Sequence, residues 1–373
     1  MSNFSGIYFH IPFCPKKCLY CDFFSVPEFS KALPDEYGKA LLNELGSRLG
    51  ELSGTKIVSV YFGGGSPTVM DERFFRKFAE SASRLGINLT ETEFTVEVNP
   101  ADIDRSWVKN LKECGVNRIS IGVQAFDDAV LAGMGRRTTV GDMKKNIPLF
   151  TEYFDNISCD LIYGLGKDRK IDQELTKVFE LAPFRHVSAY SYARPDRKNA
   201  PELLDEEETL LQEREIRDFL QERGLSRYEI SNYSLPGFES RHNMLYWTYG
   251  SWLGIGVGAA SFISGTGVSS RYADDIEAFV SGDGLSSWKL TLREKTEEFL
   301  LMGLRVKCGI NLDCFKERLG KEFFELVSEN VVSDLVQEGL LEFGGNKEII
   351  KCTERGSDFL NVILIKLFDA IRC

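Results

Sequence analysis

Three cysteines lie close together near the start of the chain, in the stretch HIPFCPKKCLYCDFF. Cys14, Cys18 and Cys21 have the spacing C-x3-C-x2-C, and three thiolates from one short loop can hold three irons of a cubane iron–sulfur cluster. The fourth iron then has no protein ligand. Such an iron can chelate a small molecule through an amine and a carboxylate, which is how S-adenosylmethionine (SAM) is bound for radical chemistry. The spacing therefore predicts a [4Fe–4S] cluster and a SAM site.

The same cysteines could instead form a zinc knuckle, or they could be three unrelated buried thiols. A closed structural zinc site needs a fourth protein ligand. His10 lies on the other side of the rigid Pro12 and cannot easily supply it. We therefore favour the iron–sulfur cluster.

Unusual residues also end each of the next predicted strands. The segment GGGSP (63–67), with Gly64, Gly65 and Ser66, follows the second strand, and Glu97 in EVNP closes the third. The following three strands end in Gln124, in Asp160 with Gly164, and in Tyr190 with Tyr192. Because chemistry in α/β barrels collects at the carboxyl ends of the strands, we expect these residues and the cysteines to line one pocket.

Each of these residues could also have a purely structural role. Residues 63–65 could form a tight turn, although three glycines also let a backbone approach a ligand closely. Glu97 could be an ordinary strand-end carboxylate, and Gln124 and Asp160 could be satisfied within a loop. Arg136, in GMGRRTT, could pair with a carboxylate or be a solvated surface arginine.

Two ring side chains have the same ambiguity. Tyr8 shares a strand face with His10, and an inward tyrosine is more often a core residue than a cofactor contact. His242 opens the motif HNMLYW. It could be a packed core histidine, or it could bind haem iron or pack against a porphyrin beside Tyr246 and Trp247.

Strand-like runs alternate with helical patterns from residue 6 to about 193. The predicted strands are Gly6–Pro12, Lys56–Phe62, Glu93–Val98, Arg118–Val123, Asn156–Ile162 and His186–Tyr192, and the helices between them are Asp35–Leu49, Asp71–Leu85, Arg105–Cys114, Gly141–Tyr153 and Ile171–Leu181. Repeated strand–helix units imply a parallel sheet with right-handed crossovers. We therefore predict an α/β fold with a partial, six-unit TIM-like barrel over residues 1–195.

Two further regions follow the predicted barrel. Residues 196–290 contain a charged amphipathic helix (201–225) and the run WLGIGVGAAS, and we expect an extension that packs on the barrel. Residues 291–373 contain helices, a hairpin around residues 344–346 and a final apolar helix, which predicts a winged-helix-like α+β domain. That domain has 12 Lys+Arg against 15 Asp+Glu, a net charge of −3. It is therefore too acidic for a DNA-binding module and suits packing or partner contact.

Composition excludes several classes of protein. The 373 residues carry a formal net charge of −11, which opposes nucleic-acid binding. No apolar run is long enough to cross a bilayer, and residues 1–20 lack the features of a signal peptide. The closing helix FLNVILIKLF is most simply a docking element of its domain, with peripheral membrane contact as the alternative. The nine cysteines form no secreted disulfide framework, which predicts a reducing cytoplasm.

Together the motifs resemble the radical SAM proteins related to oxygen-independent coproporphyrinogen III oxidase, and most closely the HemW-type haem chaperones among them. The likeness spans most of the chain through HIPFC-x3-C-x-YCDFFS, GGGSPT, VEVNP, GVNRISIGVQAF, DLIYGL, YEISNY, HNMLYW and LGIGVGA, in family order. It implies that Cys14, Cys18 and Cys21 ligate the [4Fe–4S] cluster. It also implies SAM contacts at Tyr8, Tyr20, Gly64, Gly65, Ser66, Glu97, Gln124, Arg136, Asp160 and Ala193.

Two features favour the chaperone branch over the oxidases. The oxidases have a fourth cysteine two residues after the third, where this chain has Phe23, and they carry an N-terminal extension before the first strand. The resemblance therefore implies a haem-binding protein that delivers haem to a respiratory protein, with radical decarboxylation of coproporphyrinogen as the alternative. It leaves open whether SAM is cleaved productively.

Four departures from the chaperone pattern lie on the substrate side. Thr138 and Ala260 replace histidines, GLGKDRK replaces GLPGQT, and SYARPDRKNA replaces an LTxExGT-like stretch. His242 is then the remaining candidate haem ligand. The altered loops at 166–170 and 194–199 have no role that the sequence assigns.

Overall fold

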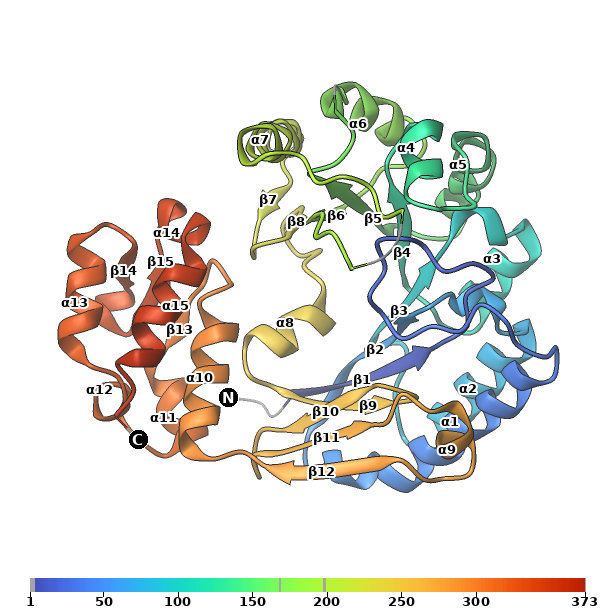
Figure 1. Cartoon of the computed structure of the whole chain (residues 1–373). Coiled ribbons are helices and arrows are strands. Elements are labelled where there is room, and N and C mark those ends of the chain that lie inside the picture. The colour runs from blue at the N-terminus through green and yellow to red at the C-terminus, as the bar shows by residue number, and fades with distance from the viewer. Residues whose placement is uncertain (1–3, 168, 197–198, 373) are drawn as a thin grey trace.

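The fold is built on six parallel strands that follow one another in chain order (Figure 1). They are β1 (Phe4–Ile11), β2 (Lys56–Gly64), β3 (Glu93–Val98), β4 (Arg118–Gln124), β5 (Asn156–Tyr163) and β6 (His186–Ser191). The computed structural model describes residues 4–167, 169–196 and 199–372. The predicted α/β fold with an unclosed parallel sheet is confirmed, and the predicted strands differ from the observed ones by one or two residues at some ends.

Helices connect these strands and cover the outer face of the sheet (Figure 1). They are α1 (Leu33–Arg48), α2 (Glu72–Arg84), α3 (Arg105–Glu113), α4 (Asp128–Gly133), α5 (Val140–Asn146) and α6 (Ile171–Phe179). Phenylalanines fill the layer between them. The Phe62 ring of β2 lies 4.4 Å from that of Phe9 on β1 and 4.9 Å from that of Phe78 on α2. Apolar strand residues therefore face the helices and leave the opposite face of the sheet to polar side chains.

The helix predicted over Gly141–Tyr153 is wrong in its second half. The α-helix ends at Asn146, and a 3₁₀ helix follows over Ile147–Glu152. Pro148 explains the break, because proline has no N–H for the helical ladder and its ring crowds the preceding turn of an α-helix.

Residues after β6 lengthen the sheet at both edges. At one edge, β8 (Asn232–Ser234) and β7 (Ser226–Arg227) continue antiparallel beyond β6 after helix α7 (Glu206–Glu222). At the other edge, β9 (Ser251–Ile255) pairs in parallel with β1, followed by β10 (Ala260–Ile263), β11 (Val268–Tyr272), helix α9 (Ile276–Val280) and β12 (Leu285–Lys289). Within the described residues the sheet has twelve strands, and its end strands β12 and β7 do not pair with each other.

Strand β9 was not predicted, because its sequence SWLGI opens a glycine-rich run, and glycine weakens a strand signal. Its Gly254 is required by close packing. A Cβ at this position would lie 2.2 Å from the carbonyl oxygen of Ala260 on β10. The glycine-rich run is therefore a seventh parallel strand.

One short helix lies on the inner side of the sheet. Figure 1 shows α8 (Arg241–Trp247) in the concave space beside β1 and β2. Glu93, the first residue of β3, accepts hydrogen bonds from the backbone amides of Arg241 (3.1 Å) and His242 (3.1 Å). These bonds hold the start of α8 against the amino-terminal end of the sheet.

The last part of the chain has its own hydrophobic core, centred on residues such as Leu300, Phe315 and Ile363. It comprises α10 (Leu292–Gly303), β13 (Ile310–Asn311), α11 (Leu312–Leu319), α12 (Phe323–Leu326), α13 (Glu329–Gln337), β14 (Leu341–Gly344), β15 (Ile349–Cys352), α14 (Glu354–Asp358) and α15 (Leu360–Asp369). The hairpin expected around residues 344–346 joins β14 to β15, and β13 completes a three-stranded antiparallel sheet.

Candidate functional site

The inner face of the sheet is polar along several neighbouring strands. This face carries Ser120 on β4, Ser158 and Asp160 on β5, and His186 on β6. Hydrogen bonds between neighbouring strands join Ser120 to Asp160 and Ser158 to His186. Because side chains alternate between the two faces of a strand, this polar layer lies opposite the phenylalanines that pack under the helices. Asp160, one of the predicted site residues, therefore lies with Ser120 on the inner face of the unclosed sheet, which together with its helices we call the half-barrel.

Glu97 lies in this layer near the end of β3. Its Oε1 accepts a hydrogen bond from the Tyr61 hydroxyl (2.8 Å), and its Oε2 accepts one from the backbone amide of Gly64 (3.1 Å). Burial, reinforced by the neighbouring Asp160, raises the pKa of Glu97 to about 7. A carboxyl group poised near neutrality and fixed by two donors is suited to accept hydrogen bonds from hydroxyl or amine groups of a ligand.

Asp160 lies on β5, two strands from Glu97, and is also held by a side chain of the protein interior. The Ser120 hydroxyl lies 3.1 Å from each of its carboxylate oxygens, and burial raises its pKa. Arg118, 2% exposed at the start of β4, faces the same interior and opposes that rise. Arg118 was not among the predicted site residues. The polar alternation Arg118, Ser120, Gly122, Gln124 along β4 is the signal that could have shown it.

The cysteine loop follows β1 and is anchored at several points. The amide of Cys14 donates to the carbonyl of Val26 (3.2 Å), and the amide of Leu19 donates to the carbonyl of Met134 (2.9 Å). His10 Nε2 lies 2.9 Å from the carbonyl oxygen of Phe24. His10 therefore fixes the far end of the loop and serves as a loop support, not as a ligand.

The three thiols of this loop are half-buried and near one another. Burial raises the pKa of Cys14 to about 12, and the neighbouring Cys21 and Cys18 add to the rise. In the described part of the chain their side chains do not converge in metal-binding geometry. Three soft thiols on one anchored loop nevertheless suit iron–sulfur ligation, and metal binding displaces the thiol protons.

Arg136 joins the cysteine loop to β4. Its guanidinium donates hydrogen bonds to the Tyr20 hydroxyl (3.0 Å) and to the carbonyl of Gly122 (2.6 Å), while its buried Nε has no partner within the described residues. Gln124 stands beside it with a φ of 67°, in the left-handed region that side chains rarely adopt. Such strain is typical of functional positions. Arg136 is thus an interior residue and not a solvated surface arginine.

The glycine-rich segment after β2 packs directly on the start of the cysteine loop. The amides of Gly65 and Ser66 donate to the carbonyls of Ile11 (2.7 Å) and Phe13 (2.8 Å). A Cβ on Gly65 would lie 2.5 Å from the Ile11 oxygen, and Gly64 has a φ of +98°. The Ser66 hydroxyl lies 2.7 Å from that of Thr68. The segment therefore holds the loop in place, whatever else it contacts.

The remaining residues expected at the SAM site lie on β1 and just after β6. The Tyr8 hydroxyl lies 3.1 Å from His10 Nδ1, so the two share the inner face of β1 as expected. Ala193 is exposed directly after β6, and Tyr190 on that strand is 45% exposed. Tyr192 is buried, and its hydroxyl donates to the carbonyl of Pro201 (2.9 Å), so it belongs to the core.

His242 lies where α8 meets β1 and β2, with its ring centre 6.2 Å from that of Tyr8 and 5.1 Å from that of Tyr61. Its Nδ1 lies 2.8 Å from the Ser59 hydroxyl and its Nε2 lies 2.7 Å from the Tyr246 hydroxyl. It is 2% exposed, and burial lowers its pKa to about 3. Haem ligation by His242 would therefore require the hydrogen bond of the iron-binding ring nitrogen, to Ser59 or to Tyr246, to be given up. This geometry is that of a packed, hydrogen-bonded core histidine.

Residues that depart from the chaperone pattern also make contacts inside the protein. Thr138 is 2% exposed and donates from its hydroxyl to Asn99. Arg169, in the altered loop 166–170, forms a two-point ion pair with Glu174 at 2.9 and 3.0 Å. Residues 168, 197 and 198 of the two altered loops lie outside the described residues. Phe23, at the position of the oxidases' fourth cysteine, is 61% exposed.

Comparison with known proteins agrees with this geometry. Residues 8–179 match the radical SAM superfamily, and residues 290–359 match the HemN C-terminal domain. The chain is 32% identical over 385 residues to "Heme chaperone HemW" of Lactococcus lactis, covering 98% of each chain, and 33% identical to "Heme chaperone HemW" of Bacillus subtilis, covering 90% and 92%. The chain belongs to the HemW family of radical SAM proteins.

A solved structure similar to this HemW-family chain is the coproporphyrinogen III oxidase HemN from Escherichia coli. The TM-score is 0.82 at 21% identity, and the likeness covers 99% of this chain and 90% of the oxidase. At this identity the comparison establishes the shared fold. Radical SAM membership implies a [4Fe–4S] cluster and SAM. No helix in the described part of this HemW relative is long and apolar enough to span a membrane.

Proposed function

We infer that this protein is a cytoplasmic haem chaperone, which binds haem and passes it to a haem-dependent respiratory protein. The observation that carries this proposal is the match to curated "Heme chaperone HemW" proteins over 98% of the chain. The agreement extends from the cysteine loop through the C-terminal domain, so it covers more than the cofactor motifs. The exposed Phe23, in place of a fourth cysteine, also favours a chaperone over an oxidase.

The cluster is assigned to Cys14, Cys18 and Cys21, and SAM to the polar layer beside it. A reduced cluster with bound SAM would supply an adenosyl radical or, without cleavage, hold the site closed. Glu97 would accept hydrogen bonds from the polar groups of SAM. Arg136 would hold Tyr20 and the loop, and Gln124 and Asp160 would complete the polar wall. The remaining expected SAM contacts are Tyr8, Gly64, Gly65, Ser66 and Ala193.

The experiment that tests the function is haem transfer. Cluster-reconstituted protein, loaded anaerobically with one equivalent of haemin, is mixed with an apo respiratory haem protein from the same cell. The acceptor is then separated and its haem spectrum recorded. Faster and more complete loading than from free haemin is the expected result.

A parallel incubation addresses the oxidase alternative. The reconstituted protein receives SAM, a reductant and coproporphyrinogen III, and deoxyadenosine and protoporphyrinogen are followed together. Little porphyrinogen product, alongside successful haem transfer, supports the chaperone. Coupled formation of both products, with no transfer to the acceptor, would replace it with the oxidase.

A further inference from the structure

The histidines of this chain are all engaged inside the protein. There are three, and each has both ring nitrogens within hydrogen-bond distance of a protein atom: His10 with Tyr8 and Phe24, His186 with Ser158 and Tyr228, and His242 with Ser59 and Tyr246. None is more than 5% exposed. A haem site in this structure is therefore better sought by the chemistry of the haem carboxylates than by an imidazole ligand.

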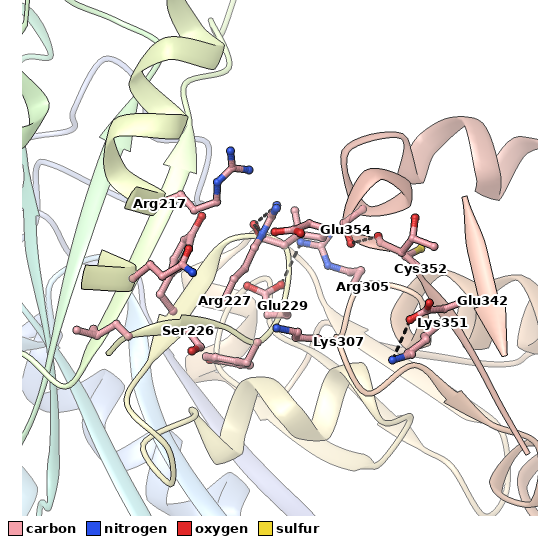
Figure 2. A pocket seen from close by; sticks show the side chains of 17 residues that line it. Arg217, Ser226, Arg227, Glu229, Arg305, Lys307, Glu342, Lys351, Cys352 and Glu354 are labelled. Atoms are coloured by element: carbon pink, nitrogen blue, oxygen red, sulfur yellow. Dashed lines mark hydrogen bonds and ion pairs between the residues drawn. The ribbon is translucent and has the colours of Figure 1, made fainter. Parts of the chain in front are cut away.

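A cleft of about 330 Å³ lies between the half-barrel and the C-terminal domain (Figure 2). One wall comes from α7 and β7, with Arg217 and Arg227, and the other from β14, β15 and α14, with Glu342, Lys351 and Glu354. Its volume is at the small end for ligand pockets, so it would enclose one edge of a tetrapyrrole and leave the rest outside. Partial enclosure suits a ligand that must be handed on.

The cleft is cationic although the chain is acidic. Five basic side chains and three acidic ones line it, while the whole chain has a net charge of −11. Three of the basic groups already have carboxylate partners. Lys351 lies 3.0 Å from Glu342, Arg305 lies 3.5 Å from Glu229, and Arg227 lies 3.7 Å from Asp358.

The other two basic groups are Arg217 on α7 and Lys307 in the segment after α10. Neither forms an ion pair within residues 4–167, 169–196 and 199–372. Figure 2 shows Arg217 on the α7 wall and Lys307 on the floor of the cleft, with the Arg227–Glu229–Arg305 group between them. Two separate cations in one cleft match a ligand with two carboxylates, because a guanidinium or ammonium forms its strongest hydrogen bonds with ionised oxygens.

The floor of the cleft is fixed. The amide of Lys307 donates to the carbonyl of Tyr228 (2.9 Å), and Glu229 forms an antiparallel bridge with Val306. The Arg305 guanidinium lies 4.6 Å from the centre of the Trp247 ring, which belongs to the HNMLYW motif. The segment YEISNY, the motif HNMLYW and the entrance to the C-terminal domain therefore meet under the two cations.

From these observations we propose that the cleft between the half-barrel and the C-terminal domain binds the two propionate carboxylates of haem, through Arg217 and Lys307. This inference rests on the proposed haem-carrying function and gives it a site. HNMLYW then contributes through Trp247, which supports the floor of the cleft, while His242 supports the helix that carries Trp247.

The test is a haem titration of the full-length, cluster-reconstituted protein, followed by absorbance. Haemin is compared with haemin dimethyl ester, which lacks the two charges. The parent, the variant Arg217→Gln/Lys307→Gln and the charge-preserving variant Arg217→Lys/Lys307→Arg are measured together. We expect the neutral variant to bind haemin about tenfold more weakly or worse, and the charge-preserving variant to stay within about threefold of the parent. The diester should bind all three proteins equally and weakly.

A matched control removes the same charge elsewhere. Lys39→Gln/Lys77→Gln changes two exposed lysines of α1 and α2, neither of which lines the cleft. It should bind haemin as the parent does. Equal haemin affinity in the parent and in the Arg217→Gln/Lys307→Gln variant overturns this site while leaving the chaperone function standing. No haem binding by the parent removes the function and the site together.

Discussion

The hydroxyl of Tyr61 donates a hydrogen bond to Oε1 of Glu97 across 2.8 Å, from the strand next to it in the sheet. Glu97 is held on its other oxygen by the amide of Gly64, the last residue of β2, just before the segment that packs on the cysteine loop. The carboxylate thus joins β3 to β2 at the point where β2 leads into the segment that packs on the cluster loop. Its environment leads to a prediction about pH.

Glu97 should make stability depend on pH in a defined window. Its pKa is raised from 4.5 to about 7, so the folded chain keeps a proton between these values that the unfolded chain has lost. Stability contributed by this group therefore falls as pH rises from about 4.5 to about 7. Urea unfolding at several pH values should show that fall in the parent and a smaller one in Glu97→Gln. Identical pH profiles would mean that Glu97 is not protonated in the folded state.

His242 should give folding stability the opposite dependence on pH. Burial lowers its pKa from 6.5 to about 3, so between these values the unfolded chain binds a proton that the folded chain does not. Stability is therefore lost as pH falls from about 6.5 toward 3. We expect His242→Gln to weaken this acid-side loss and to leave the haem spectrum unchanged. A changed haem spectrum at neutral pH in this variant would instead make His242 an iron ligand. Because the windows of Glu97 and His242 overlap, the two single variants must be compared with the double variant.

The sequence could predict the strands, the cysteine motif and the ends of the strands where the polar residues gather. These follow from spacing and from alternation along the chain. It could not predict that Arg118 lies buried between Glu93, Tyr61 and Asp160, because those partners come from separate strands. For the same reason it could not predict the bonds of His242 to Ser59 and Tyr246. The cationic cleft was also hidden, since Arg217 and Lys307 are far apart in sequence and join only when the C-terminal domain docks.

The iron content of cysteine-to-serine variants should distinguish the cluster cysteines from the other cysteines of the chain. Replacing Cys14, Cys18 or Cys21 with serine should reduce bound iron from about four per chain to less than about one after anaerobic reconstitution. Cys352→Ser is the matched control, because Cys352 lies in the C-terminal domain and should leave iron content unchanged. Full iron content in any of the three loop variants would remove that cysteine from the ligand set.

The turn after β2, which packs against the start of the cysteine loop, should tolerate no side chain at Gly65. A Cβ there would lie 2.5 Å from the Ile11 carbonyl oxygen and 2.8 Å from that of Phe13. We expect Gly65→Ala to cost about 1–3 kcal/mol of unfolding free energy, because the loop must move away. Gly46→Ala is the control. Gly46 lies in α1 with open space around it, so alanine should stabilise the helix by up to about 1 kcal/mol. Equal stability of the two variants would contradict this close packing of Gly65.

The C-terminal domain should loosen when Glu229 loses its charge. The Glu229 side chain is fully buried and lies 3.5 Å from Arg305, so Glu229→Gln keeps the shape but leaves that guanidinium without its counter-ion. We expect a loss of about 2–4 kcal/mol, below that of a wholly buried pair because Arg305 is 26% exposed. Limited proteolysis should then cut faster near residue 290. Glu342→Gln breaks the exposed pair with Lys351 and should cost less than about 1 kcal/mol. Similar losses in both variants would show that Glu229 does not fasten the domain, and that the floor of the cleft is held by its backbone bonds alone.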